Sequence, residues 1–125
     1  MSLICVGTMA FDAIETPFGK TDKIVGGAAT YIAWSASYFS KLINIVSVIG
    51  DDFDMKELEL LKNENGTNKT RGKVDTRGID IKEGKKSFFW SGKYHMDMNT
   101  RDTLVTDLNV LAKFNPKVPD SYQNC

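Results

Sequence analysis

Two short apolar runs flank a helical pattern, and this order limits the fold more than any other feature of the sequence. The runs are "LICVG" (residues 3–7) and "INIVSVIG" (residues 43–50), and each ends in glycine. Such runs are typical of strands buried on both faces. Between them, small and apolar residues recur at helical spacing, namely Ala29, Ile32, Ala33, Ala36 and Phe39. A strand, a helix and a strand in this order predict an α/β fold with a parallel sheet.

The rest of the chain divides into four segments. A second helix is predicted over about residues 52–62, with Asp51 or Asp52 near its N-cap and an apolar stripe that contains Leu58 and Leu61. Residues 63–77 are almost wholly polar and are interpreted as a loop. Aromatic and β-branched residues over 88–107, with turn residues in the middle, predict a β-hairpin. The last 13 residues contain two prolines and no period, so we expect an irregular surface segment.

Composition excludes several classes of protein. The chain of 125 residues suits one compact domain, and its 16 basic residues balance 16 acidic residues, which argues against nucleic acid as a partner. Cys5 and Cys125 cannot form a disulfide framework, and no segment has the apolar length of a membrane span or the pattern of an export signal. We therefore expect a cytoplasmic protein with no membrane partner. His95 is the only histidine, which disfavours a zinc site.

A carboxylate and a glycine pair are the first candidates for a binding site. Asp12 follows the first predicted strand, and ligands of α/β proteins gather at the carboxyl ends of strands, where a carboxylate can accept hydrogen bonds from two neighbouring hydroxyls. Gly26 and Gly27 precede the first helix, where a ligand can approach the backbone and its free N–H groups. The alternatives are a turn-forming aspartate and a plain tight turn. The glycines fit neither a Walker P-loop nor the dinucleotide fingerprint.

The hairpin supplies further candidates. Arg101 is placed where it can reach an anionic group of a substrate, although a solvated arginine is the ordinary case. The aromatic residues Phe88, Phe89, Trp90 and Tyr94 suit either a stacking surface or a packed core. No nucleophilic triad is present in the sequence.

The motifs "GTMAFD", "GGAATYIA" and "VSVIGDDF", in this order and spacing, resemble the N-terminal part of the PfkB or ribokinase family of carbohydrate and nucleoside kinases. The resemblance implies a ribokinase-like, Rossmann-like core over residues 1–12 and 26–62. It also implies a small β lid, built from residues 13–25 and 86–107, that closes over a sugar and often pairs with its copy in a dimer. By the same resemblance, Asp12 binds substrate hydroxyls, and Gly26, Gly27 and Ala28 bring the backbone against the sugar.

The sequence departs from the family in three respects. Tyr31 stands where family members usually have an asparagine, and the polar stretch over residues 63–73 is longer than the usual short link. The "GAGD" motif is absent. In family members its aspartate acts as the base and its glycine-rich amides stabilise the phosphoryl group. ATP and Mg are therefore expected for the complete family enzyme and not for this chain, for which no catalytic residue is assigned.

Three functional hypotheses follow. The first is the substrate-binding and lid part of a sugar kinase, which in complete form transfers the γ-phosphate of ATP to a sugar hydroxyl. The second is a non-catalytic α/β scaffold, truncated or engineered, that forms homo-oligomers through its lid strands or through an open sheet edge. The third is a flavodoxin-like binding domain.

Overall fold

The two apolar runs form neighbouring parallel strands, as predicted. The computed structural model describes residues 2–123. Its first sheet has the order β1-β5-β6, in which β5 (Leu42–Gly50) lies between β1 (Ser2–Val6) and β6 (Lys73–Lys82) and is parallel to both. All residues of β5 after Leu42 are buried. The outer side of β1 pairs with no strand among residues 2–123, and Leu3, Ile4 and Val6 are exposed there.

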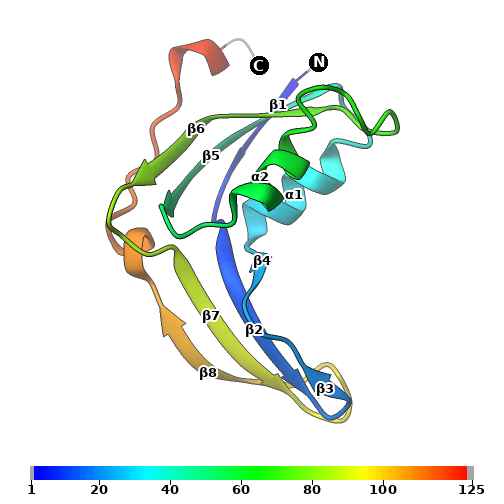
Figure 1. Ribbon diagram of the computed structural model, residues 1–125, viewed down its shortest axis with the longest axis vertical. Coiled ribbons are helices and arrows are strands. Elements are labelled where there is room, and N and C mark those ends of the chain that lie inside the picture. The colour runs from blue at the N-terminus through cyan, green and yellow to red at the C-terminus, as the bar shows by residue number, and fades with distance from the viewer. Residues whose placement is uncertain (1, 124–125) are drawn as a thin grey trace.

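Two helices, α1 (Ala28–Ala36) and α2 (Met55–Lys62), cover one face of this sheet (Figure 1). The core between the helices and the sheet contains Cys5, Met9, Ala29, Ala33, Ile43, Ile45, Ile49, Phe53, Leu58, Leu61, Val74 and Ile79. The predicted stripe of α1 is wrong at two positions, because Ile32 is 55% exposed and Phe39, beyond the end of the helix, is 92% exposed. No helix of the described chain has the length and apolar character needed to cross a membrane.

The prediction for the start of α2 is also wrong. Asp54 is the N-cap residue, and its Oδ1 accepts hydrogen bonds from the backbone N–H groups of Lys56 and Glu57, at 3.0 and 3.3 Å. Asp51 and Asp52 instead accept hydrogen bonds from the connection between β6 and the next strand. Asp51 accepts from the Gly84 amide at 2.7 Å, and Asp52 accepts from the amide and the hydroxyl of Ser87, both at 2.8 Å.

The polar segment 63–77 is a loop only up to residue 72. From Lys73 onward the chain forms β6, a strand that the sequence analysis did not predict. The pairing of β6 with β5 shifts by one residue after Asn44, so that Val74 and Ile79, five residues apart, both point toward the helices. This bulge breaks the alternation from which a strand is ordinarily recognised, and charged residues fill five of the other eight positions of β6.

A second sheet projects away from the first (Figure 1). Its path is β3 (Gly19–Lys20), β2 (Ala10–Thr16), β7 (Phe88–Tyr94) and β8 (Arg101–Asp107), and β4 (Ile24–Gly26) also pairs with β2. The hairpin predicted over residues 88–107 is present as the antiparallel pair β7 and β8. Every residue of β8 is exposed.

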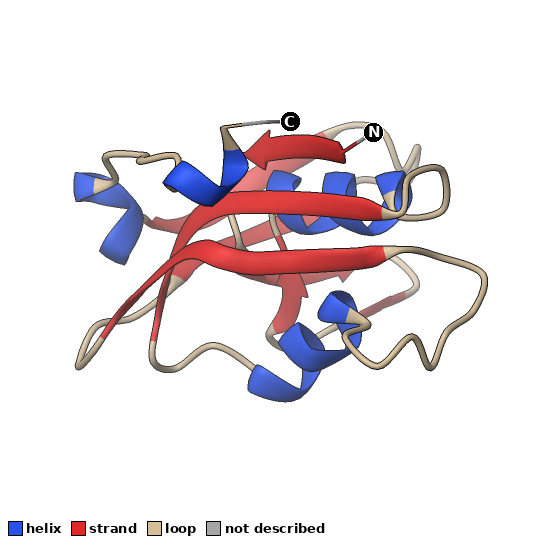
Figure 2. Ribbon diagram, turned by 90° about the horizontal axis from the view of Figure 1, so that it is seen from above, coloured by secondary structure: helices blue, strands red, loops and turns tan. Residues whose placement is uncertain are grey.

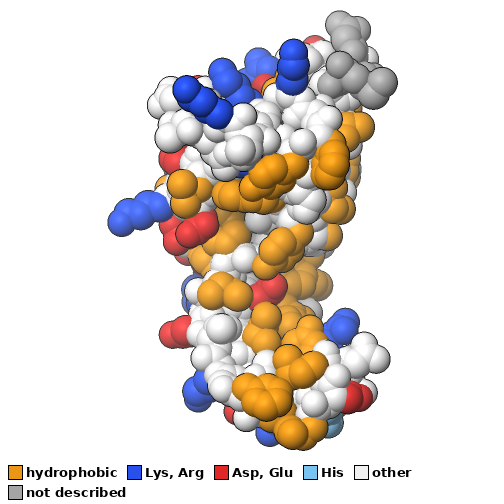
Figure 3. Space-filling view, turned by 90° about the vertical axis from the view of Figure 1, so that its right-hand side faces the viewer, with side chains coloured by type: hydrophobic (Ala, Val, Ile, Leu, Met, Phe, Trp, Pro, Cys, Tyr) orange, Lys and Arg blue, Asp and Glu red, His pale blue; other side chains and the backbone are white. Residues whose placement is uncertain are grey.

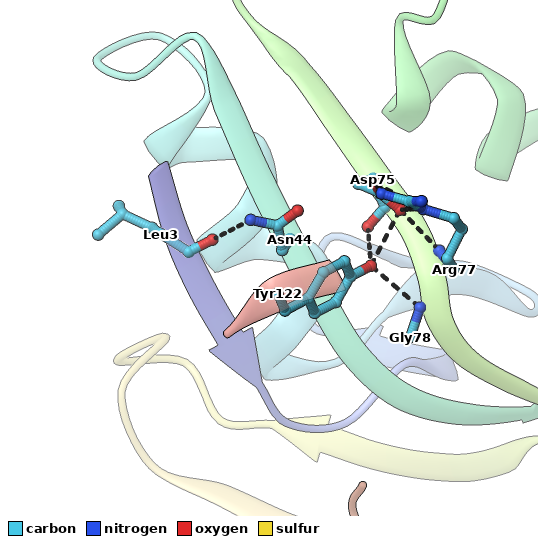
Figure 4. A network of polar contacts seen from close by, with 6 residues as sticks. All are labelled: Leu3, Asn44, Asp75, Arg77, Gly78 and Tyr122. Atoms are coloured by element: carbon cyan, nitrogen blue, oxygen red, sulfur yellow. Dashed lines mark hydrogen bonds and ion pairs between the residues drawn. The ribbon is translucent and has the colours of Figure 1, made fainter. Parts of the chain in front are cut away.

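The segment after β8 covers the face of the first sheet that the helices leave open. It contains two 3₁₀ helices, η1 (Asn109–Lys113) and η2 (Asp120–Tyr122), and it returns to the side of the molecule where β1 begins (Figures 1 and 2). The expectation of a surface segment is wrong for Tyr122, which is fully buried. Its hydroxyl accepts a hydrogen bond from the Gly78 amide at 3.0 Å and lies 3.0 Å from Oδ1 of Asp75 (Figure 4).

Candidate functional site

Asp12 lies against Gly26 at the base of the second sheet. Asp12 follows the first strand at a distance of six residues and belongs to the next strand, β2. A Cβ atom added to Gly26 would be 2.0 Å from Oδ2 of Asp12, and glycine therefore leaves the space that the carboxylate occupies. The structure thus brings together two residues that the sequence analysis singled out.

The Asp12 carboxylate has no hydrogen-bond or ion-pair partner among residues 2–123, although the residue is partly buried. Burial raises the pKa of Asp12 above its ordinary value, because removal from water disfavours the ionised form. A charged group without a protein partner destabilises the fold at neutral pH. Its free oxygens are suited to accept hydrogen bonds from a ligand that carries hydroxyl groups.

Gly27 is fixed by the connection between β1 and β2. It has φ +96°, and an added Cβ would be 2.5 Å from the carbonyl oxygen of Thr8. Thr8 also holds the first turn of α1, since its hydroxyl accepts from the Ala28 amide at 3.1 Å and its carbonyl accepts from the Ala29 amide at 2.9 Å. Close packing therefore accounts for Gly27, and a ligand would reach the Ala28 amide only by displacing the Thr8 hydroxyl.

Trp90 is a site residue that the sequence left ambiguous. It pairs with Asp12 across β2 and β7, and paired residues project from the same face of a sheet. Its indole Nε1 donates a hydrogen bond to the Thr103 hydroxyl at 3.4 Å, and its ring covers Gly92, where an added Cβ would be 2.2 Å from the ring. An aromatic ring on the same sheet face as a carboxylate is suited to stack on a sugar ring or a base.

Arg101 lies further along the same face. Arg101 lies in β8 and pairs with Tyr94 of β7. It is two strands across and four residues along from Asp12, so the Cα atoms of Arg101 and Asp12 are roughly 16 Å apart. Its guanidinium reaches back to 5.9 Å from the centre of the Trp90 ring. The structure therefore does not place Arg101 beside Asp12, and Trp90 lies between them.

The side of the molecule that carries β4 and the adjoining end of β2 is shown in Figure 3, where hydrophobic side chains gather over the second sheet with charged groups around them. Tyr31 is 57% exposed on α1, with its hydroxyl 3.5 Å from the Val25 carbonyl. The site is thus an open surface made of one free carboxylate, one aromatic ring and one distant cation.

The residues of the described chain do not provide a metal site. Within residues 2–123 no three His, Cys, Asp or Glu side chains are grouped so that they could hold a metal ion. The resemblance implies ATP and Mg, and the described residues offer no cluster of ligands that would hold the metal without the nucleotide.

Comparison with known proteins identifies the fold. No protein-family profile and no curated protein sequence matches the chain. Among solved structures, a fructokinase from Halothermothrix orenii superposes with a TM-score of 0.63 at 19% identity over 87% of this chain. A nucleoside kinase from Burkholderia thailandensis in complex with inosine gives a TM-score of 0.64 at 16% identity over 87% of this chain. A ribokinase from Cryptococcus neoformans in complex with ADP gives 0.62 at 18% identity over 86% of this chain.

The chain therefore has the α/β fold of ribokinase-like sugar and nucleoside kinases, as the sequence analysis expected. It represents only part of that fold, because it spans 38%, 35% and 34% of the lengths of the fructokinase, the nucleoside kinase and the ribokinase.

Proposed function

We propose that the chain is the substrate-binding and lid part of a PfkB or ribokinase-family kinase, which in complete form transfers the γ-phosphate of ATP to a hydroxyl of a sugar or nucleoside. The solved structures that share its fold include a fructokinase and a nucleoside kinase in complex with inosine, which supports this class of substrate. In this proposal the second sheet is the lid, and the chain by itself binds a substrate without phosphorylating it.

The observation that carries the proposal is the free carboxylate of Asp12 on the same face of the second sheet as Trp90, its partner in the strand pairing. Asp12 accepts hydrogen bonds from hydroxyl groups of the ligand, Trp90 stacks on its ring, and Gly26 leaves the room that the carboxylate needs. Arg101 lies far enough from Asp12 to contact the opposite end of a ligand as long as a nucleoside. Gly27 and Ala28 shape the base of the site through their contacts with Thr8.

The experiment is a thermal-shift titration with a panel of sugars, sugar acids and nucleosides. One ligand class is expected to raise the melting temperature of the wild-type chain by several degrees at 100-fold excess over Kd, and to raise that of the Asp12→Asn variant little or not at all. Because burial raises the pKa of Asp12, the neutral amide is expected to leave the unliganded melting temperature unchanged or higher at pH 7. A lost ligand shift then reports on binding and not on unfolding.

Asp107→Asn is the matched control. Asp107 lies in β8 opposite Phe89, on the other face of the same sheet, and it has no hydrogen bond or ion pair within residues 2–123. This variant is expected to keep the full ligand shift. Equal shifts in all three proteins, or no shift with any member of the panel, would contradict the proposed site.

A second candidate function, self-association, is favoured by two exposed strand edges. The outer edge of β1 is unpaired in the described chain, with Val6 50% exposed, and β8 exposes Leu104 at 55% on the edge of the other sheet. We expect a dimer in light scattering at micromolar concentration, and Leu104→Lys is expected to weaken it if β8 forms the contact, whereas Val6→Lys is expected to weaken it if β1 does. A monomer at millimolar concentration would rule out this candidate.

A further inference from the structure

A groove lined by lysines lies outside the candidate substrate site. It has a volume of about 690 Å³ and lies between the open face of the first sheet and the segment after β8. Its apolar surface includes Val110 and Phe114, and its rim contains five lysines, namely Lys82, Lys85, Lys86, Lys113 and Lys117. Asp12, Gly26, Trp90 and Arg101 are not among its lining residues. We call this feature the lysine groove.

Among the described residues, carboxylates form an ion pair with only one lysine of the lysine groove. Asp80 is the acidic residue that lines it, and this carboxylate pairs with Lys82 at 2.7 Å. The other four lysines form no ion pair with any residue of the described chain. They gather here although the chain as a whole has equal numbers of acidic and basic residues. Four like charges around one groove repel one another, and an anion between them removes that repulsion.

The backbone that carries these lysines is held in place from both sides. On one side, Asp51 and Asp52 accept hydrogen bonds from the amides of Gly84 and Ser87, at 2.7 and 2.8 Å, so their oxygens serve the backbone. On the other side, the Val110 amide donates to the Lys86 carbonyl at 3.1 Å, and the Asn109 side chain donates to the Ser87 carbonyl at 2.9 Å. The connection 84–87 and η1 are therefore held against one another by hydrogen bonds, which fixes the relative positions of the backbone segments that carry these lysines.

We propose that the lysine groove binds a small anion that carries two or more phosphate groups. Lys85 and Lys86 contact it from the connection before β7, and Lys113 and Lys117 contact it from the segment after β8. Ammonium groups act as point charges toward phosphate oxygens and need no fixed orientation. The volume of about 690 Å³ suits a small ligand, and the apolar wall formed by Val110 and Phe114 is suited to the non-phosphate body of such a ligand.

The test is calorimetric titration of the chain with tripolyphosphate at low ionic strength. The wild type is expected to bind one equivalent, and the double variant Lys113→Gln/Lys117→Gln is expected to bind about tenfold more weakly. The matched control is Lys41→Gln/Lys56→Gln, which removes the same charge from two exposed lysines without ion pairs that lie outside the groove. The control is expected to bind within twofold of the wild type, and all three proteins are expected to melt together because the replaced side chains are exposed.

Equal weakening in both double variants would show that only the overall charge matters and would overturn the proposal, as would the absence of saturable binding. Sulfate at the same ionic strength is expected to displace tripolyphosphate poorly. If sulfate bound as tightly as tripolyphosphate, several phosphate groups would not be required, and the proposal would be overturned. An RNA oligomer that binds more tightly than tripolyphosphate and is not displaced by it would assign the surface to nucleic acid and overturn the proposal.

Discussion

Replacement of Tyr122 by alanine is expected to lower the free energy of unfolding by about 3–5 kcal/mol, the range for removal of a large aromatic side chain from a core. The ring is fully buried against β5 and β6, where a Cβ added to Gly78 would be 2.8 Å from it. Urea denaturation measures the loss. Phe39→Ala is the control, because that ring is 92% exposed, and it is expected to cost less than about 0.5 kcal/mol. Equal stabilities of the two variants would contradict the role of Tyr122 as an anchor.

Tyr122→Phe separates the hydroxyl from the ring. It leaves the Gly78 amide without its acceptor and is expected to cost about 1–3 kcal/mol. Burial raises the pKa of Tyr122 to about 12, against about 10 in an unfolded chain. Because the pKa is higher in the folded protein, the contribution of the neutral Tyr122 hydroxyl to the free energy of unfolding is complete below about pH 10. It is lost as the pH rises toward 12. The stability difference between wild type and Tyr122→Phe is therefore expected to shrink over that interval.

A carboxylate network around Tyr122 explains why the contact is specific. Burial by itself raises the pKa of Asp75, but hydrogen bonds from Arg77 and Tyr122 outweigh this effect and hold the pKa below its ordinary value. The Arg77 guanidinium lies 2.6 Å from Oδ2 of Asp75 (Figure 4). The segment after β8 is thus held to β6 by an ionised group as well as by an apolar ring.

Local patterns were sufficient to predict the centre of the fold. The strand β5 is predictable from its continuous apolar run, and the helix α1 from small and apolar residues at helical spacing. The start of α2 was not predictable in the same way, since three aspartates compete for the cap within four positions. Asp54 takes that position, while Asp51 and Asp52 bind amides more than 30 residues away in the sequence.

Burial that depends on distant partners could not be predicted. Tyr122 contacts residues 44 and 47 positions earlier, and nothing in the sequence around it has a period. At the candidate site, Asp12 and Gly26 were identified individually, but their contact depends on the pairing of β2 with β4. The place of Trp90 follows from its register opposite Asp12, which the hairpin pattern alone does not define.

Arg71 shows why the polar segment 63–72 is part of the structure of the core. Its side chain is only 7% exposed, and its guanidinium lies 4.1 Å from the centre of the Trp34 ring. It donates to the Leu61 carbonyl at 2.9 Å, to the Leu60 carbonyl, and to the Ser37 hydroxyl at 3.1 Å. These acceptors lie at the C-terminal ends of both helices, where a cation is favourable. Arginine is ordinarily solvated, so the sequence by itself predicts only a polar loop here.

Arg71→Met is therefore expected to lower the free energy of unfolding by about 2–3 kcal/mol, because it keeps most of the volume but leaves the helix-end carbonyls without their donor. Burial lowers the pKa of Arg71, so its charge is costly in the fold, and an apolar replacement could in principle relieve that cost. The donated hydrogen bonds and the stacking on Trp34 are expected to outweigh that cost.

Arg71→Lys keeps the charge without the planar fork and is expected to recover less than half of the lost free energy of unfolding. Lys69→Ala, an exposed neighbour in the same segment, is the control in urea denaturation. If Arg71→Met were as stable as Lys69→Ala, the buried guanidinium would not hold the two helix ends together.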